Sequence, residues 1–456
     1  MDVEYLPEHR SFSARHSRLY IAISKLFTMR LLNTGTVELH EFFEHDIPEY
    51  AILSHRWEQE EVTFETVTEQ RNLQAAGWDK VRRCCSLVRE NGFAWIWIDT
   101  CCINKNSSVE LSEAINSMYN WYRNAKICFV HLNDVCCLPE EVQAYQDLVE
   151  AKGHDDNPCH CSVQTSAQLT RSTWFTRGWT LQELIAPHLV IFVDSAWRMF
   201  GSRMTLNDLV SNITGIAQPN AIVIQRESIA TKMSWAGRRT CTRSEDMAYS
   251  LMGLFEVNMP LLYGEGGPRA FRRLQLEILQ RSDDETIFAW SSNSASELHG
   301  FSSPLAASPS CFIHSSNIRP FKSIIPRPSY AVTNTGLQIH TVLLQGCDPP
   351  GNEETNRLCF LPLHCHRDGE TLPLALRLRR WAIGIYQRTM DNNLDWPEDS
   401  ELGEQGCSNL GTIRIIHDTD GSIDAALPHT RDIDKVTLRS LQNAVNRIHL
   451  TNWHPA

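Results

Sequence analysis

Three absences narrow the functions open to this 456-residue chain. No run of apolar residues reaches the roughly 20 that a membrane-spanning helix needs, which argues against a membrane span. Positive charge is not in excess, because 54 acidic residues outnumber 42 lysines and arginines and leave a net charge of -12. Such a chain lacks the electrostatic footprint of a general nucleic-acid-binding protein, so we expect no nucleic-acid partner.

A hydrophobic signal segment is also missing from the start, which reads MDVE. The fifteen cysteines therefore do not indicate a secreted, disulfide-bonded protein. Adjacent cysteines rarely bridge each other, and three adjacent pairs occur here: Cys84–Cys85, Cys101–Cys102 and Cys136–Cys137. We expect free thiols, a reducing compartment and a cytoplasmic location.

The N-terminal region has a composition of its own. Residues 11–37 contain no acidic residue but several arginines, lysines and serines, as in a mitochondrial transit peptide. Asp2, Glu4 and Glu8 make the extreme N-terminus acidic, which favours a short amphipathic helix instead. We treat residues 1–28 as an N-terminal extension.

Four short apolar runs predict buried strands, at residues 50–54, 93–98, 126–132 and 189–194. They are continuous rather than alternating, which is typical of a parallel sheet covered on both faces. Helical patterns lie between them, so we expect an α/β domain over residues 29–200 with helices on both faces of a mainly parallel sheet. A polar stretch at about 144–172 reads as an inserted loop.

The remainder of the chain divides in two. Residues 201–290 read as a helical extension, in which Pro268 opens a helix with an apolar stripe of Phe271, Leu274 and Ile278. From residue 291 to 456, proline, serine and asparagine become frequent and short β-like runs appear. This pattern predicts a C-terminal antiparallel β domain.

Three motifs stand out in this order along the chain. The first is YAILSHRW at residues 50–57, and the second is WIDTCCINK at 97–105, followed by EAINSMY at 113–119. The third is WFTRGWTLQELIAP at 174–187. Together they resemble the fungal HET (heterokaryon incompatibility) domain from about residue 29 to 187, and residues 242–253 and 262–266 extend the resemblance.

The resemblance implies a function. HET-domain proteins act in vegetative incompatibility and trigger programmed cell death when non-self is recognised. The family is regarded as remotely similar to TIR domains, which implies a TIR-like or flavodoxin-like sheet. It also implies self-association on activation and a NOD-like or other incompatibility protein as partner. The alternatives are a non-catalytic signalling or interaction module and a regulator associated with a gene cluster.

Polar residues follow the predicted strands, where ligands bind in open α/β sheets. His55 follows the first run, and it reads either as a general base or polar contact or as a structural, hydrogen-bonded histidine. Asp99 follows the second run, and it reads either as a ligand-facing carboxylate or as a helix N-cap. Both pairs of alternatives stay open on the sequence.

Glu183 is the sharpest catalytic candidate, because it lies between Leu181 and Leu184 on a short predicted helix. The alternative is a first-turn glutamate that favours the helix dipole and pairs with an arginine. TIR enzymes cleave the nicotinamide–ribose bond of NAD with a glutamate in a W-x-x-x-E-like segment, and residues 179–183 match that pattern. The resemblance therefore implies NAD as a substrate, no cofactor, and substrate-binding roles for His55, Trp57, Asp99, Trp179 and Arg177.

A weaker pattern is a group of zinc-type ligands in the polar stretch: His154, Cys159, His160 and Cys161. Their spacing fits no standard zinc site, so we interpret them as part of a polar loop and expect no metal.

Overall fold

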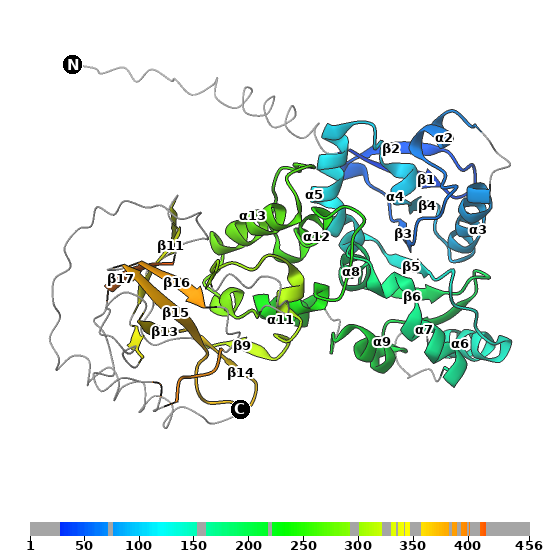
Figure 1. Ribbon diagram of the computed structural model, residues 1–456. Helices are drawn as coiled ribbons and strands as arrows, with labels where there is room; N and C mark the ends of the chain where they lie inside the picture. Colours follow the sequence, from blue (N-terminus) through cyan, green and yellow to red (C-terminus); the bar gives the residue numbers. More distant parts are fainter. Residues whose placement is uncertain are drawn as a thin grey trace, which may run out of the picture. The chain divides into compact units, whose positions relative to one another are not determined.

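The computed structural model (Figure 1) describes most of the chain from residue 28 to residue 415. The described ranges are 28–71, 76–152, 161–217, 221–291, 301–321, 330–333, 336–341, 343–346, 357–382, 385–389, 394–398, 401 and 411–415. Two compact units divide them: the first holds the residues up to 175 with 182–213 and 217–221, and the second holds 176–181, 214–216 and the rest.

A seven-stranded sheet forms the centre of the first unit, with strand order β2-β1-β4-β3-β5-β6-β7. The four predicted strands are its middle, and they are neighbours that all pair in parallel. They are β4 (Trp95–Trp97), β3 (Ala51–His55), β5 (Ile127–His131) and β6 (Val190–Val193). The prediction of adjacent parallel strands is therefore confirmed. Numbered among themselves along the chain, these strands lie in the order 2-1-3-4.

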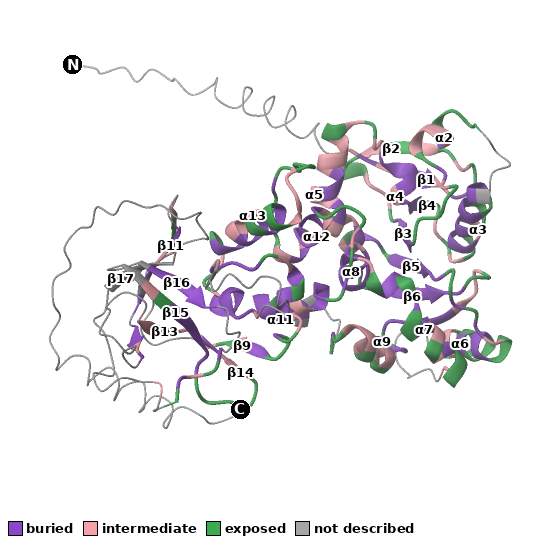
Figure 2. Ribbon diagram, in the orientation of Figure 1, coloured by how far each residue is buried: buried purple, intermediate pink, exposed green. Residues whose placement is uncertain are grey.

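Antiparallel strands complete the sheet at both edges, which makes it mixed rather than parallel throughout. They are β1 (Thr28–Asn33), β2 (Leu39–Phe43) and β7 (Met199–Ser202), and the sequence patterns did not predict them. In contrast, every residue of β3, β5 and β6 is buried (Figure 2), which explains their unbroken apolar runs.

Two long helices, α3 (Ala76–Glu90) and α5 (Ser108–Asn124), lie on opposite sides of the strands in Figure 1. The chain moves one way across the sheet from β3 to β4 and the other way from β4 to β5, so right-handed crossovers place the two helices on opposite faces. The predicted cap of α5 is present, since the Ser107 hydroxyl accepts a bond from the Glu110 amide at 3.3 Å.

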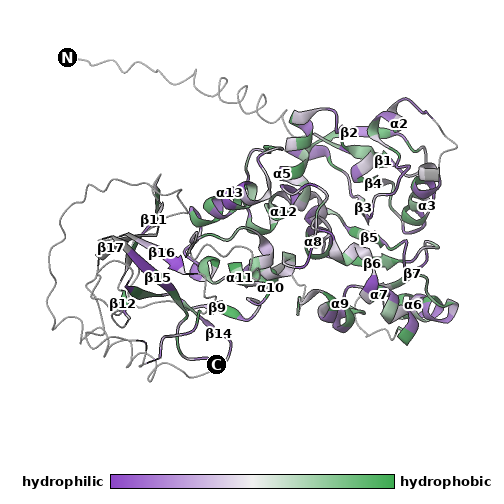
Figure 3. Ribbon diagram, in the orientation of Figure 1, coloured by the Kyte–Doolittle hydropathy of each residue, from purple (hydrophilic) through white to green (hydrophobic). Residues whose placement is uncertain are grey.

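The expectation of a loop at 144–172 was wrong in its described parts. Helices α6 (Pro139–Lys152) and α7 (Val163–Arg171) occupy this stretch. The polar residues form solvated faces (Figure 3), while Val142, Tyr145 and Leu169 are buried. The prediction relied on the polar composition of the stretch and missed the helical spacing of its few apolar residues.

Shorter helices complete the first unit and begin the second. They are α2 (Phe64–Thr68), α4 (Asp99–Cys102), α8 (Thr180–Ile185), α9 (Asn207–Thr214), α10 (Ala221–Arg226), α11 (Ile229–Ala236), α12 (Asp246–Tyr249) and α13 (Gly267–Leu279). As predicted, α13 carries Pro268 in its first turn and buries Phe271, Leu274 and Ile278. Among the described residues, no helix is both long and apolar enough to cross a membrane.

The C-terminal part of the second unit is β-rich, as expected. Strands β8 (Phe301–Ser302), β10 (Ala331–Thr333), β11 (Gly336–Thr341), β12 (Leu344–Gln345), β13 (Leu358–Pro362), β15 (Ala375–Ala382), β16 (Ile385–Thr389) and β17 (Gly411–Ile415) form an eight-stranded sheet. All its pairings are antiparallel except that of β16 with β17. A second sheet pairs β9 (Ile318–Pro320) with β14 (Cys365–Arg367). The domain boundaries given above remain predictions.

Candidate functional site

An open hollow lies at the carboxyl ends of the parallel strands in the first unit. Its volume is about 450 Å³, and it is lined by Arg56, Trp57, Glu58, Gln59 and Asn133. The first four residues follow β3, and Asn133 follows β5. The strand order reverses between β3 and β5, because β4 lies on the other side of β3. The hollow is therefore at the topological switch point, where open α/β sheets bind ligands.

Trp57 presents an indole ring to this hollow, and the ring is fixed in place. Its Nε1 donates to Asp99 Oδ2 at 2.7 Å, and the Lys105 ammonium lies 3.5 Å from the ring centroid. Lys105 Nζ is also 4.0 Å from the Asp99 carboxylate, and burial lowers the pKa of Lys105. Trp57 remains 46% exposed, so an oriented aromatic surface stays available to a planar ligand.

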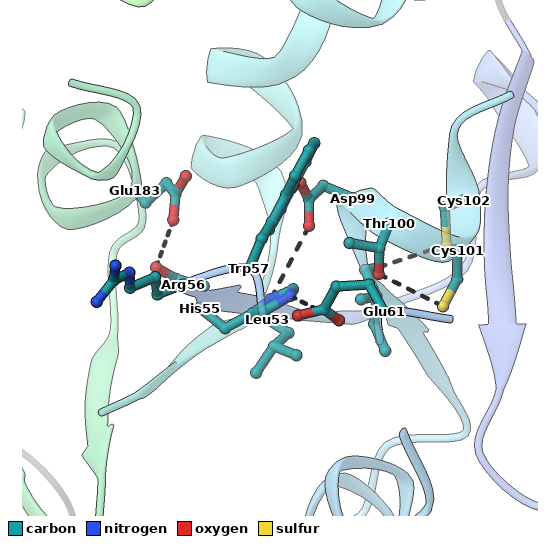
Figure 4. A network of polar contacts seen from close by, with 12 residues as sticks. Leu53, His55, Arg56, Trp57, Glu61, Asp99, Thr100, Cys101, Cys102 and Glu183 are labelled. Carbon is teal, nitrogen blue, oxygen red and sulfur yellow. Dashed lines mark hydrogen bonds and ion pairs between the residues drawn. The ribbon is translucent and has the colours of Figure 1, made fainter. Parts of the chain in front are cut away.

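Asp99 is the first residue of α4, whose N-cap is Ile98, so the N-cap alternative for Asp99 was wrong. Its carboxylate faces the turn after β3 instead. The buried ring of His55 lies between Asp99 and Glu61, with Nδ1 3.9 Å from Asp99 Oδ1 and Nε2 3.6 Å from Glu61 Oε2 (Figure 4). Neither ring nitrogen has a hydrogen-bond partner among the described residues. His55 is thus a buried imidazole held between two carboxylates.

Lys80 supplies the positive charge under this group. Its ammonium contacts Glu61 Oε1 at 2.6 Å and Glu58 Oε2 at 3.4 Å, and it donates to the Arg56 carbonyl at 3.3 Å. Burial opposes ionisation of Glu61, but the contacts with His55 and Lys80 outweigh it and lower its pKa to about 2. Glu61 is therefore a carboxylate that the folded state keeps ionised.

Because of Glu61, the free energy of unfolding should depend on pH below about pH 4.5. Its pKa falls from the ordinary value of 4.5 to about 2 on folding, so its contribution is complete above pH 4.5 and is lost as pH falls towards 2. We expect Glu61→Gln to lower the free energy of unfolding at pH 7 by on the order of 3 kcal/mol. The difference between the variant and the parent should shrink steadily below pH 4.5, as measured by urea unfolding across pH 7 to 3.

Glu150→Gln is the matched control, because Glu150 is exposed on α6. Its effect should stay within about 0.5 kcal/mol at each pH. A Glu61→Gln effect that is the same at pH 3 and pH 7 would contradict the assigned ionisation.

A second buried histidine lies beside the first. His131 ends β5 and is the register partner of His55 on β3. Its ring stacks on Trp197 at 4.1 Å between centroids, and burial, reinforced by Lys80 and His55, lowers its pKa to about 4. His131 is therefore neutral near pH 7, and its Nε2 has no hydrogen-bond partner among the described residues.

Glu183 belongs to a different network, which joins the first and third motifs. The Ser54 hydroxyl donates to Glu183 Oε2, and the Trp174 indole Nε1 donates to Ser54 Oγ at 2.8 Å. Glu183 is only 8% exposed, and it does not line the hollow beside Trp57. Burial and the Glu183 charge raise the pKa of the nearby Tyr122 phenol, so this neighbour stays protonated.

Arg177 and Trp179 belong to the second unit. The Arg177 carbonyl accepts from Arg239 Nη1 at 2.9 Å, and the Trp179 indole donates to Asp246 Oδ2 at 3.3 Å. Gly178 between them is required by close packing, because a Cβ there would lie 2.3 Å from Cys241 Sγ. The Trp179 side chain thus has a structural partner, whereas the Arg177 bond is to its backbone carbonyl, and the substrate-binding roles of both residues remain predictions.

The sequence placed His55 and Asp99 on one rim of the sheet, and the structure brings them together with Trp57. Sequence reasoning missed Glu61, Lys80, Ser54 and Trp174, which hold the candidate residues in place. The acidic run at residues 58–61 was a usable signal for Glu61, because carboxylates beside a buried histidine favour ion pairing. Ser54 and Trp174 gave no such signal, since they lie 120 residues apart in the chain.

The cysteines and the zinc-type residues do not form a site in the described part of the chain. The twelve cysteines described there are free thiols. No group of three or more potential metal ligands occurs among the described residues. His154, Cys159 and His160 lie outside them, and Cys161 is half-buried.

Comparison with known proteins relates two parts of the chain to family models and about half of it to a curated protein. Residues 50–183 match the family model "Heterokaryon incompatibility protein (HET)", and residues 269–307 match a domain of unknown function, DUF8212. Vegetative incompatibility protein HET-E-1 of Podospora anserina is 40% identical over 236 residues. These cover 51% of this chain but only 16% of that protein. No solved structure matches the chain.

The matched family region coincides with the geometry described above. It begins at β3 and ends at Glu183, and it therefore contains the hollow, the His55 group and the network from Trp174 to Glu183. The three motifs, the family model and the similarity to HET-E-1 agree. Residues 50–183 therefore form a heterokaryon incompatibility (HET) domain.

Proposed function

We propose that this protein is a vegetative incompatibility effector that triggers programmed cell death on recognition of non-self, and that its HET domain does so by TIR-like hydrolysis of NAD. The role in incompatibility is supported by the HET family match and by the name of the relative that is 40% identical. Because the aligned region is 16% of that relative, the activity and the partners are proposals for this chain. We also propose that the protein self-associates on activation and that its partner is a NOD-like or other incompatibility protein.

The observation that carries the chemical part is the hollow at the switch point between β3 and β5. Its lining suits a nucleotide, since Trp57 offers a ring for stacking, Asn133 and Glu58 offer polar atoms, and Arg56 offers a cation. The strand order 2-1-3-4 is also that of the first four strands of flavodoxin-like sheets, which bind a nucleotide at this point.

Glu183 is the proposed catalytic carboxylate. As nicotinamide leaves, positive charge develops on the ribose, and a fixed negative charge stabilises it. Ser54 holds the carboxylate at the carboxyl end of β3 and orients it. Because Glu183 is buried and does not line the hollow, its contact with substrate requires the Ser54 bond to open. We propose that the hydrogen bond between Ser54 and Glu183 opens when the protein is activated.

The burial of Glu183 favours a second candidate, a non-catalytic signalling module. In that case Trp174, Ser54 and Glu183 only brace the helix α8 against β3. The hollow would then bind a ligand or partner segment without chemistry.

Nicotinamide release from NAD by concentrated, purified full chain tests the enzyme. We expect release, and we expect Trp57→Ala to lower kcat/KM for NAD by about tenfold or more, because the stacking surface is removed. Leu372→Ala, at another exposed apolar position, is the control and should match the parent. If overexpression kills a fungal host while concentrated protein releases no nicotinamide, the non-catalytic module is correct.

A further inference from the structure

An apolar loop in the second unit is exposed yet fixed. Leu262 is 50% exposed and Tyr263 is 36% exposed. The Leu262 amide donates to the Tyr249 hydroxyl at 2.9 Å, and the Tyr263 hydroxyl donates to Asp246 Oδ1 at 3.0 Å. Gly264 N donates to Glu245 Oε1 at 3.0 Å. Because these bonds already order the loop, a partner that covers it loses little conformational entropy.

Arginines border this loop. The Arg243 guanidinium lies 4.3 Å from the Tyr263 ring centroid. Ser244 accepts from the Gly267 amide at 3.1 Å, which places the start of α13 beside this segment. Arg269 and Arg272 are exposed on the first turns of α13, and neither forms an ion pair within the described ranges. We call Arg243, Leu262, Tyr263, Arg269 and Arg272 the basic surface.

The first unit carries a surface of opposite charge. Residues 38–49 contain five acidic residues and no lysine or arginine. Of these, Glu38, Glu41 and Asp46 are exposed and make no ion pair with another described residue, and Phe43 beside them is 47% exposed. Glu38 directly precedes β2, Glu41 and Phe43 lie on it, and Asp46 follows it. Strand β2 is the end strand of the seven-stranded sheet and has one neighbour among the described strands. We call Glu38, Glu41, Phe43 and Asp46 the acidic edge.

We propose that the basic surface of one copy docks on the acidic edge of a second copy. The exposed charged residues named around each apolar centre carry one sign, because Glu245 beneath the basic surface is buried and Asp246 is half-buried and bonded to Tyr263. Each surface therefore complements the other and repels a second copy of itself. A two-fold dimer that pairs identical surfaces is therefore disfavoured. The contact is head-to-tail, and repeated contacts of this type build a ring or an open filament. The proposal specifies the surfaces for self-association and does not depend on NAD hydrolysis.

Charge reversal tests this contact in the purified full chain without NAD. We expect sedimentation at increasing protein concentration to show association at 50 mM NaCl that weakens by at least about tenfold at 500 mM NaCl. Arg269→Glu with Arg272→Glu should abolish it, and so should Glu41→Lys with Asp46→Lys. A mixture of the two double variants should associate again, because the reversed surfaces complement each other.

Two control pairs reverse charge elsewhere, Arg83→Glu with Arg89→Glu on α3 and Asp147→Lys with Glu150→Lys on α6, and both should associate like the parent. Melting temperatures establish that each variant is folded, and Arg269→Ala with Arg272→Ala replaces the glutamate pair if that pair is unfolded. A chain that stays monomeric at every concentration overturns the proposal. So does association that survives both reversals, or a mixture that stays monomeric.

Discussion

Glu183→Gln should lower NAD cleavage by on the order of 10²–10³-fold and should abolish cell death on overexpression. The substitution keeps the side-chain volume, and the amide oxygen can still accept from the Ser54 hydroxyl. The fold should therefore survive, with a loss of about 1 kcal/mol in unfolding free energy. What disappears is the fixed negative charge that stabilises the developing charge on the ribose. Nicotinamide release, melting temperature and scored cell death measure the three effects.

Two further variants distinguish a catalytic role of Glu183 from a structural role in holding α8 against β3. Glu183→Asp keeps the charge but withdraws it by one methylene, so a folded, inactive variant supports a positioned carboxylate. Ser54→Ala keeps Glu183 but removes the hydroxyl that holds it, and it should reduce kcat more than KM. Glu277→Gln, a half-exposed glutamate of α13, should behave like the parent. A stable Glu183→Gln protein that still kills would remove Glu183 from the mechanism.

The middle of the first sheet was predictable because burial on both faces leaves a local signature. Every residue of β3 and β5 is buried, so each strand reads as an unbroken apolar run. Edge strands carry a weaker signature. In β2 only two of five residues are even half-buried, and nothing in its sequence separates it from a loop. Helices α6 and α7 were not predicted for a similar reason, since few of their residues contact the core.

Only those residues of the candidate site that lie at or just after the ends of predicted strands could be placed from the sequence. His55 ends β3, Asp99 and Asn133 follow β4 and β5, and parallel strands end at one rim. The contacts that hold Glu183 depend on side chains brought from far along the chain: Ser54 is 129 residues away from it. A single sequence does not show which residues so far apart in the chain contact each other in the fold. The burial of Glu183 was therefore not foreseeable, although its position on a short helix was.

Asp194→Ala should be among the most destabilising single substitutions in the first unit, at about 3–5 kcal/mol of unfolding free energy. Asp194 is fully buried at the end of β6. One carboxylate oxygen accepts from the amides of Ala196 and Arg198 at 3.0 and 2.9 Å. The other accepts from Arg198 Nη2 at 2.6 Å and from the Cys137 amide at 3.3 Å. Alanine leaves these donors without their acceptor.

The turn that Asp194 holds is also strained, which adds to the expected loss. Trp197 has a φ of 64°, a left-handed conformation that bulky residues rarely adopt, and there it stacks on His131. Without Asp194 the turn can relax, and the cover over His131 beside the hollow should loosen. Asp147→Ala, at an exposed aspartate of α6, is the control and should cost within about 0.5 kcal/mol in urea unfolding. An Asp194→Ala loss as small as that of the control would show that the carboxylate does not hold the turn.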